Sequence, residues 1–428
     1  MSESQFLPAL MFYVILFIAL AGISPSLNIA LVGIIFGFFF VGLDLFLSIP
    51  SQIYDNLYNL NWLSIPLAIY FSSIARNLIS WQEIQTVWKD VDKKWLTVIT
   101  LILLLPINSI FTGLIGGTGT TSNVRNTFFL KKINNDKVDL DFLKIIQLIS
   151  ISLIPPSLVF LVLLNSIEIN LPRFFSLIIM PACLYALLCQ IFLFWNIKKF
   201  HINLEMPTQE IQTKRKWLFL KLASPYLFLI IFMALVINDL LSINETFCLA
   251  VLCVTILLIV NKKKLYKTIL FSSYKQTSTL CAVIFFSYIC AQFFLGTFRS
   301  LGGDDLLLNL MDTLPDNMNL QVLVILSFIF LFQFLFSWLE VSFILIPLIY
   351  PILSYLNIDY MWFLVLVCFS LHNVSFSTPL GINSISLFGK FKKQKFSEYL
   401  KKYFPLFCIQ IGILSFVFFN PNFFIVDS

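Results

Sequence analysis

The chain is poor in charge: of its 428 residues 12% are charged and only two are histidine, whereas 59% are hydrophobic. Soluble globular proteins carry about 25% charged residues, so this composition excludes a soluble enzyme and indicates a polytopic membrane protein. The longest hydrophilic segment, 198–216, is too short for a nucleotide-binding domain, and no GxxxxGK[ST] motif occurs. The net charge of +6 does not indicate a nucleic-acid partner, because the basic residues lie in short loops between apolar runs.

Metal-binding and disulfide patterns are also absent from the sequence. The eight cysteines lie in apolar runs and none belongs to a CxxC pair, so neither a zinc site nor a disulfide framework is indicated. The first residues lack a basic segment, and we expect 8–23 to be a retained span rather than a cleaved signal peptide. Phenylalanine, with 48 residues, is abundant, and we expect these side chains mainly to face lipid.

Long apolar runs are the main feature that is present, and about 20 residues are enough to cross the hydrocarbon core. The runs predict two helical hairpins, at 95–131 and 320–356. They also predict spans at 8–23, 28–48, 59–75, 140–164, 173–197, 217–237, 244–260, 276–297, 360–389 and 404–422.

The run 320–356 is too long for one crossing and contains the carboxylate Glu340. A charge at the bilayer centre costs roughly 2.5–3.5 kcal/mol on insertion scales, so Glu340 should face protein or a water-filled cavity. We therefore predict a hairpin that enters halfway and returns, with 336–342 at its tip. The following run, 360–389, is broken by 377–383, which contains Pro379.

The same pair of elements occurs in the first half of the chain. The run 95–131 has a tip of small and polar residues at 116–123, and 140–164 is broken by Ile154–Ser157. The repetition predicts two repeats, 1–200 and 217–428, joined by a cytoplasmic linker at 201–216. The expected fold is an all-α polytopic membrane protein, an inverted repeat of two five-span halves, each with a re-entrant hairpin and a discontinuous helix. Such elements are typical of the binding sites of secondary transporters.

The distribution of Lys and Arg predicts the orientation of the spans. Basic residues cluster at 76–94, 131–144, 198–221, 262–275 and 390–402, and only Arg173 and Arg299 fall in loops of the opposite side. Because cytoplasmic loops carry the excess of positive charge, both termini should lie outside the cytoplasm. The two halves then have opposite orientations, as an inverted repeat requires.

The tips and breaks supply the candidate binding residues, since hydroxyls, carbonyls and a carboxylate suit a hard cation such as Na⁺. The glycines at 116–119 can also be a close helix contact, and Glu340 can also cap a half-helix or pair within the protein. Arg125 can meet an anionic substrate or be an arm residue that faces the cytoplasm. The cation candidates are Gly117, Thr118, Gly119, Pro155, Ser157, Ser337, Glu340, Thr378, Gly381 and Asn383. The substrate candidates are Thr121, Ser122, Asn123, Arg125 and Ser377.

Five segments resemble a known family: Asn61–Leu67, Leu153–Ser157, Phe298–Asp304, Trp338–Ile344 and Pro379–Asn383. In this order, and over essentially the whole chain, they resemble the large permease subunit of tripartite ATP-independent periplasmic (TRAP) transporters. The similar branch is the one labelled C4-dicarboxylate or mannitol/chloroaromatic type. One departure is Ser337, where the family usually has an aspartate three residues before the glutamate, and it predicts a weaker second cation site.

The resemblance implies an elevator-type, Na⁺-driven importer of a small organic acid in a bacterial inner membrane. It also implies a four-span small permease subunit and a periplasmic solute-binding protein as partners, with no cofactor besides the coupling ion and no enzymatic activity. The alternatives are a stand-alone dicarboxylate carrier or a Na⁺/H⁺ antiporter of the same superfamily. A polytopic glycan polymerase or ligase is disfavoured, because the longest external loop, 298–319, has one arginine and no histidine.

Overall fold

The structure is a computed structural model that describes residues 3–20, 24–77, 153–167, 169–200, 227–228, 230–261, 265–333, 335–377 and 396–424. The predicted first hairpin at 95–131 and the linker at 201–216 lie outside these residues. Within the described ranges every regular element is a helix, which confirms the all-helical class.

The chain divides into two compact units, and each unit combines segments from both predicted halves. The first unit comprises Met1–Trp62, Val162–Asn170 and Cys281–Ser428, and the second comprises Leu63–Leu161 and Leu171–Leu280. The boundaries of these units therefore differ from the predicted repeat boundary near 201–216, and the division into repeats stays a prediction.

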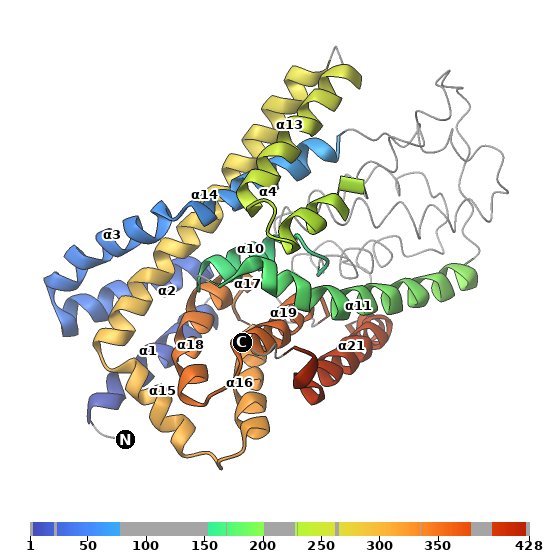
Figure 1. The fold of residues 1–428 in the computed structure, drawn as a ribbon. Helices are drawn as coiled ribbons and strands as arrows, with labels where there is room; N and C mark the ends of the chain where they lie inside the picture. Colours follow the sequence, from blue (N-terminus) through green and yellow to red (C-terminus); the bar gives the residue numbers. More distant parts are fainter. Residues whose placement is uncertain are drawn as a thin grey trace. The chain divides into compact units, whose positions relative to one another are not determined.

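The first unit contains helices from both ends of the chain. Its helices are α1 (Glu3–Leu20), α2 (Pro25–Phe36), η1 (Gly37–Val41), α3 (Leu43–Tyr58), α15 (Gly303–Asp312), α16 (Met318–Phe332), α17 (Trp338–Glu340), η4 (Val341–Leu345), α18 (Ile346–Tyr355), α19 (Tyr360–Ser377), α21 (Phe396–Phe419) and η5 (Pro421–Phe423). Helix α1 packs on α2 and α15, while α16 and α21 pack on α19 (Figure 1).

The ring of Phe12 meets those of Phe294, Phe298, Phe328 and Phe332 edge-on, at centroid distances between 5.2 and 6.5 Å. Edge-to-face aromatic pairs each contribute about 0.5–1.5 kcal/mol beyond their buried area. Phe294, Phe298 and Phe332 of this cluster are buried, whereas Phe328 is 44% exposed at its edge.

The second unit contains α4 (Ser64–Ala75), α11 (Leu171–Phe200), α13 (Ile243–Asn261) and the helical residues 230–237. Three further helices have residues in both units: η2 (Leu60–Leu63), α10 (Leu158–Asn165) and α14 (Tyr266–Ser300). Helices α4 and α13 lie side by side, and Phe71 of α4 packs on Phe228 with ring centroids 4.4 Å apart. At the end of α4, Ser73 Oγ and Arg76 Nη2 both donate to Gln276 Oε1, at 3.1 and 3.0 Å. These bonds join α4 to the first part of α14.

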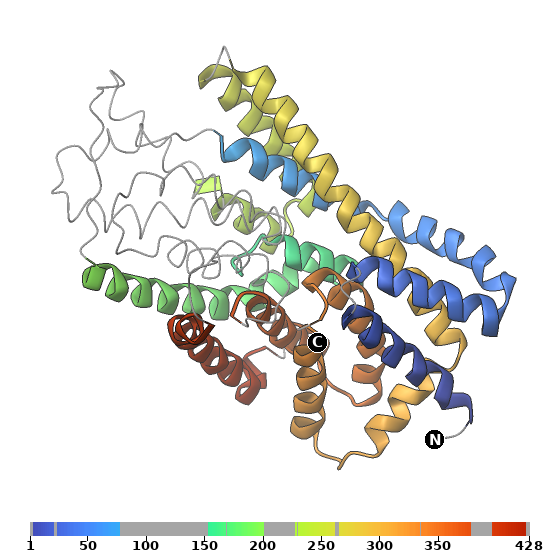
Figure 2. The same cartoon turned by 180° about the vertical axis from the view of Figure 1, so that it is seen from behind.

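Residues 318–355 form two helical arms joined by a turn, at the position of the predicted second hairpin, and their entry only halfway into the membrane stays a prediction. Asn317 caps α16 by accepting from the N–H groups of Asn319 and Leu320, at 3.1 and 3.4 Å. The chain turns after Phe332 and returns through α17, η4 and α18 beside α16 (Figures 1 and 2). The predicted tip at 336–342 is wrong in detail, because 338–342 are already helical and the turn ends at Ser337.

Three predicted helix boundaries are also wrong. The span predicted at 28–48 ends at Val41, because Gly42 adopts φ 104°, a conformation that glycine reaches easily and that ends the helix. The separate helix α3 follows. Helices α14 and α21 begin at Tyr266 and Phe396, about ten and eight residues before their predicted starts at 276 and 404. Their basic residues were expected in loops, but long basic side chains can reach water from the end of a spanning helix.

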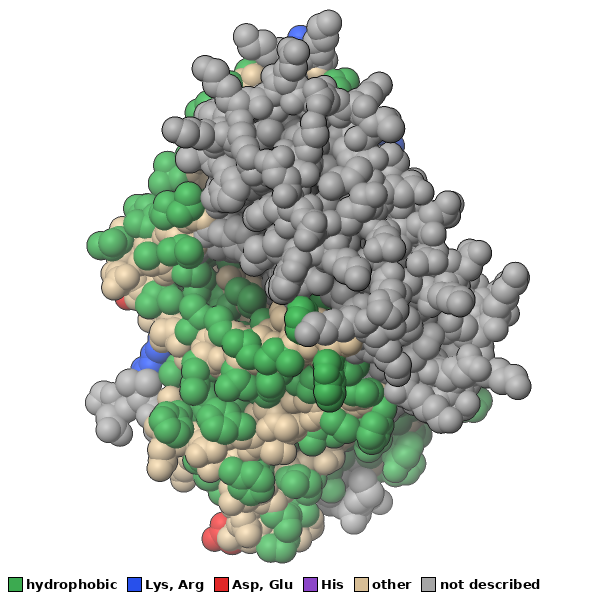
Figure 3. Space-filling view, turned by 90° about the vertical axis from the view of Figure 1, so that its right-hand side faces the viewer, with side chains coloured by type: hydrophobic (Ala, Val, Ile, Leu, Met, Phe, Trp, Pro, Cys, Tyr) green, Lys and Arg blue, Asp and Glu red, His purple; other side chains and the backbone are tan. Residues whose placement is uncertain are grey.

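Within the described residues, four helical segments are long and apolar enough to cross a membrane: Leu171–Trp195, Ile243–Val260, Tyr266–Ser300 and Trp338–Tyr355. Large apolar side chains are exposed on several helices, such as Phe39 at 73% and Leu47 at 78%. On the face shown in Figure 3 the described surface is mainly hydrophobic, with only isolated charged side chains. Such a surface is suited to lipid rather than to water.

Candidate functional site

Glu340 lies in the first turn of the helix that returns from the hairpin turn. Ser337 precedes this helix with an extended backbone, and its hydroxyl oxygen accepts from the N–H of Leu339 at 3.3 Å. The Ser337 N–H donates to Glu340 Oε2 at 3.0 Å, and the Ser337 hydroxyl also donates to this oxygen. This is a capping box, which satisfies the free N–H groups at the start of a helix. Glu340 therefore helps to cap the helix that begins at Trp338, which agrees with the capping alternative; that this helix crosses only half of the membrane stays a prediction.

The other carboxylate oxygen of Glu340 is bound by a different part of the chain. The hydroxyl of Ser26, in the first turn of α2, donates to Glu340 Oε1 at 2.7 Å. Ser26 Oγ in turn lies 2.8 Å from Ser287 Oγ of α14. Glu340 is only 4% exposed and Ser287 only 3%. Three elements of the first unit therefore meet at one buried carboxylate.

The hydrogen bonds to the carboxylate of Glu340 leave one acceptor position without a donor among the described residues. An ionised carboxylate has about four acceptor positions. Donors fill two positions on Oε2 and one on Oε1. Among the described residues no Lys or Arg forms an ion pair with Glu340. A buried charge without a partner of opposite charge is costly, so a cation or a proton at the fourth position, on Oε1, would lower the free energy of the site.

In the helical arm just after Glu340, one backbone carbonyl has no hydrogen-bond donor from its own helix. In η4 the Ile346 N–H bonds back to the carbonyl of Val341, one residue further than in an α-helix. Pro347 has no N–H, so the carbonyl of Ser342 lacks a donor from its own helix. Ser166 Oγ donates to this carbonyl over 3.4 Å. Such π turns often occur at functional sites.

At the first predicted break, 153–157 are not helical and α10 begins at Leu158; the preceding half of the predicted helix, 140–152, lies outside the described residues, so the broken helix stays a prediction. Pro155 and Ser157 both lie in this break. The Ser157 carbonyl accepts the Leu161 N–H at 3.1 Å, but its hydroxyl, in a residue only 1% exposed, has no hydrogen-bond partner within the described part of the chain. An unsatisfied buried hydroxyl costs about 1–3 kcal/mol, so Ser157 is suited to a ligand.

Of the remaining candidate residues, one is described by its backbone alone and the others lie outside the described residues. Ser377 ends α19, and only its backbone is described. Pro155 and Ser157 belong to the second unit, whereas Ser337 and Glu340 belong to the first. The candidates outside the described residues are Gly117, Thr118, Gly119, Thr121, Ser122, Asn123, Arg125, Thr378, Gly381 and Asn383.

The sequence analysis did not identify Ser26 and Ser287 as site residues. Each is a single hydroxyl in or beside an apolar run, which is a weak signal. The spacing Ser337–Glu340, by contrast, is the S-x-x-E pattern of a capping box and could have located the start of the returning helix.

A helical hairpin and a buried acid within apolar helices are typical of secondary membrane transporters. Comparison with protein families agrees with this class. The family model described as "Tripartite ATP-independent periplasmic transporter, DctM component" matches residues 149–423. This is more than half of the 428 residues, and the chain belongs to this family.

The fold is similar to the YdaH transporter of Alcanivorax borkumensis, whose crystal structure is described as having an unusual topology. The TM-score is 0.54, the sequence identity is 12%, and 90% of each chain is covered. At this identity the similarity concerns the fold alone. No match was found among the curated proteins.

Proposed function

We propose that this chain is the large permease subunit of a TRAP transporter and that it imports a small organic acid together with Na⁺. Membership of the DctM family supports the role of permease. The observation that carries the ion coupling is Glu340, a buried carboxylate with neutral donors at three positions and, among the residues that the structure describes, none at the fourth. A hard cation prefers such oxygen ligands.

In this proposal coupling ions bind at the tips and breaks. Glu340 and Ser337 contribute oxygen ligands to one cation site at the second hairpin, and Ser157 contributes its hydroxyl to another at the first break. Thr118 and Asn383 add ligands from the parts outside the described residues. Arg125 pairs with the carboxylate of the substrate, and movement of the hairpins in an elevator-type transition carries both across the membrane.

The proposed partners are a four-span small permease subunit and a periplasmic solute-binding protein. The description of the family as tripartite and periplasmic supports them. The proposed location is a bacterial inner membrane with both termini in the periplasm, which is supported by the clustering of Lys and Arg in alternate loops.

The test is uptake into liposomes that contain the purified chain together with its small subunit. Radiolabelled organic acids are supplied with the solute-binding protein, under an inward Na⁺ gradient, an equal K⁺ gradient or a proton gradient. We expect uptake that requires both the binding protein and Na⁺. Uptake driven equally well by K⁺ would overturn Na⁺ coupling, and uptake driven only by protons would replace Na⁺ with H⁺.

Co-purification distinguishes the proposal from a stand-alone carrier or a Na⁺/H⁺ antiporter. A TRAP permease should retain a small four-span protein through purification. A chain that purifies alone and transports without a binding protein would contradict the tripartite assembly. Exchange of Na⁺ for H⁺ without any substrate would instead indicate an antiporter.

A further inference from the structure

Helix α18, the returning arm of the second hairpin, has a gap in its backbone hydrogen bonds. Pro347 and Pro351 lie four residues apart in this helix. A carbonyl in an α-helix accepts from the N–H four residues further on, and proline has no N–H. The carbonyl of Pro347 therefore lacks its donor, because the residue in that position is Pro351.

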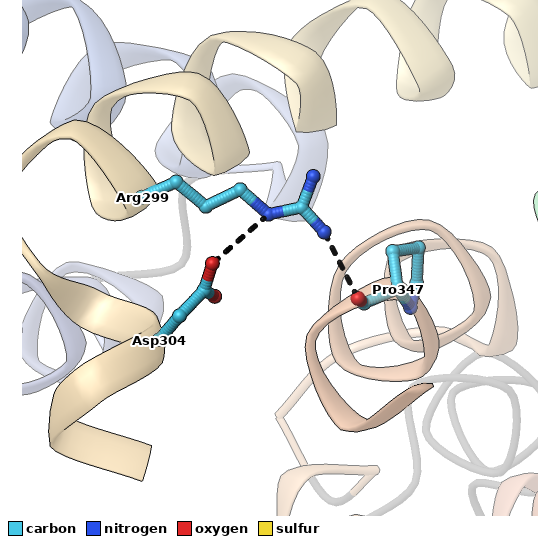
Figure 4. Close-up of polar contacts among 3 residues, drawn as sticks. All are labelled: Arg299, Asp304 and Pro347. Carbon is cyan, nitrogen blue, oxygen red and sulfur yellow. Dashed lines mark hydrogen bonds and ion pairs between the residues drawn. The ribbon is translucent and has the colours of Figure 1, made fainter. Parts of the chain in front are cut away.

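Arg299 fills this gap from another helix. Its Nη2 donates to the Pro347 carbonyl at 3.0 Å, and its Nε lies 3.7 Å from Asp304 Oδ2 (Figure 4). Arg299 and Asp304 are 46% and 42% exposed, so their ion pair alone contributes little to stability. Its effect is to orient the guanidinium, whose fixed fork then presents a donor to the carbonyl.

Arg299 lies beside the corner between α14 and α15, where two glycines and a buried ring pack closely. Gly302 between α14 and α15 has φ 81°, a conformation that favours glycine. A Cβ on Gly303 would lie 2.2 Å from the ring of Phe298, which is completely buried. Phe298 and the two glycines thus fix the backbone on both sides of Arg299.

We propose that Arg299 is a positioning residue of the second hairpin, which replaces the donor missing at Pro351 and fixes α18 to the corner between α14 and α15. Its role in transport rests on the proposed function, because the helical arm that it holds begins with the helical turn that contains Glu340. Its role in holding α18 does not depend on transport.

The test is a double-mutant cycle in the full-length chain, using Arg299→Met, Pro351→Ala and the combination. Arg299→Met removes the donor at similar side-chain length, and Pro351→Ala restores the backbone N–H that the Pro347 carbonyl lacks. Amide hydrogen exchange is measured over α18. We expect Arg299→Met to raise exchange there roughly tenfold, as for one hydrogen bond from a charged group. In the Pro351→Ala background most of that rise should disappear.

The control is Lys275→Met, which removes another exposed cation of α14 and should leave exchange over α18 unchanged. Where uptake is measurable, Arg299→Met should lower the maximal rate without changing the Na⁺ concentration for half-maximal uptake, and Pro351→Ala should restore the rate. If Arg299→Met fails to fold, Arg299→Leu, which also removes the donor, is measured by the same criterion. An unchanged exchange rate, or an equal rise with and without Pro351, would overturn the inference even if Na⁺-driven uptake is found.

Discussion

The hydroxyl of Ser26 donates to Oε1 of Glu340 over 2.7 Å, although the two residues are 314 positions apart in the sequence. This bond connects the start of α2 with the first turn of the helix that returns from the hairpin turn. Because Ser26 is a neutral donor, it does not compensate the charge of the carboxylate. In the proposed function the bond fixes this helical turn and draws electron density on Oε1 away from the cation bound at its other acceptor position.

Replacing Ser26 with alanine removes this competing donor. We expect the Na⁺ concentration for half-maximal uptake to fall, because the electron density on Oε1 is then fully available to the cation. A hydrogen bond to a charged group contributes about 1.5–3 kcal/mol, so the fall should be roughly tenfold or more. The control is Ser327→Ala, which removes a hydroxyl that donates to the Leu323 carbonyl of its own helix. A higher Na⁺ requirement in Ser26→Ala would show that Ser26 is a ligand rather than a competitor.

Replacing Ser337 with aspartate should make the Na⁺ dependence of uptake steeper, with a higher Hill coefficient. Aspartate keeps the cap of α17 and adds a second carboxylate. At an effective dielectric constant near 20, a charge at about 4 Å contributes roughly 4 kcal/mol, part of which is offset by desolvation. Ser337→Asn is the matched control, because it keeps the cap without the charge. Equal Hill coefficients in the two variants would contradict the prediction.

Replacing Ser157 with alanine should raise the Na⁺ concentration needed for half-maximal uptake. Its buried hydroxyl has no partner within the described residues, so its loss should leave thermal stability unchanged or slightly higher. Ser72→Ala is the control, since the Ser72 hydroxyl is equally buried but donates to the Ile69 carbonyl at 2.8 Å. That variant should lose stability and keep its Na⁺ dependence. Unchanged Na⁺ dependence in Ser157→Ala would remove Ser157 from the site.

The predicted orientation is tested by labelling single cysteines in a chain that lacks the eight native ones. A membrane-impermeant reagent added from outside should reach cysteines at Asp304 and Asp427 but not at Lys263 or Lys393. The physical reason is that basic loops remain in the cytoplasm. External labelling at Lys393 would contradict the inverted repeat.

The turn between α16 and α17 and the non-helical segment 153–157 could be predicted because their causes are local. Glu340 within an apolar run and the prolines at 155 and 156 are visible in the sequence without knowledge of neighbouring helices. The end of the second span was missed although its cause is also local, because a glycine within an apolar run signals a positive φ only weakly. Gly42 ends that helix in the structure.

The partners of Glu340 could not be predicted, because their positions depend on how distant helices pack. Ser26 and Ser287 are 261 residues apart, and their hydroxyls meet only after α2 and α14 have come together. The same holds for Arg299, whose acceptor on Pro347 lies 48 residues away. In that case the spacing of Pro347 and Pro351 shows that a carbonyl lacks its donor, but the spacing does not show which side chain supplies one.

The central claim is that the charge of Glu340 couples Na⁺ to transport, and Glu340→Gln tests it most directly. Glutamine at this position can still complete the capping box, so the variant should fold with the thermal stability of the parent. The measurement is Na⁺-driven uptake into liposomes by equal amounts of folded parent and variant. Coupling through the carboxylate predicts that the variant loses Na⁺-driven uptake by at least about tenfold. Uptake with the parent's rate and Na⁺ dependence would show that Glu340 only caps the helix.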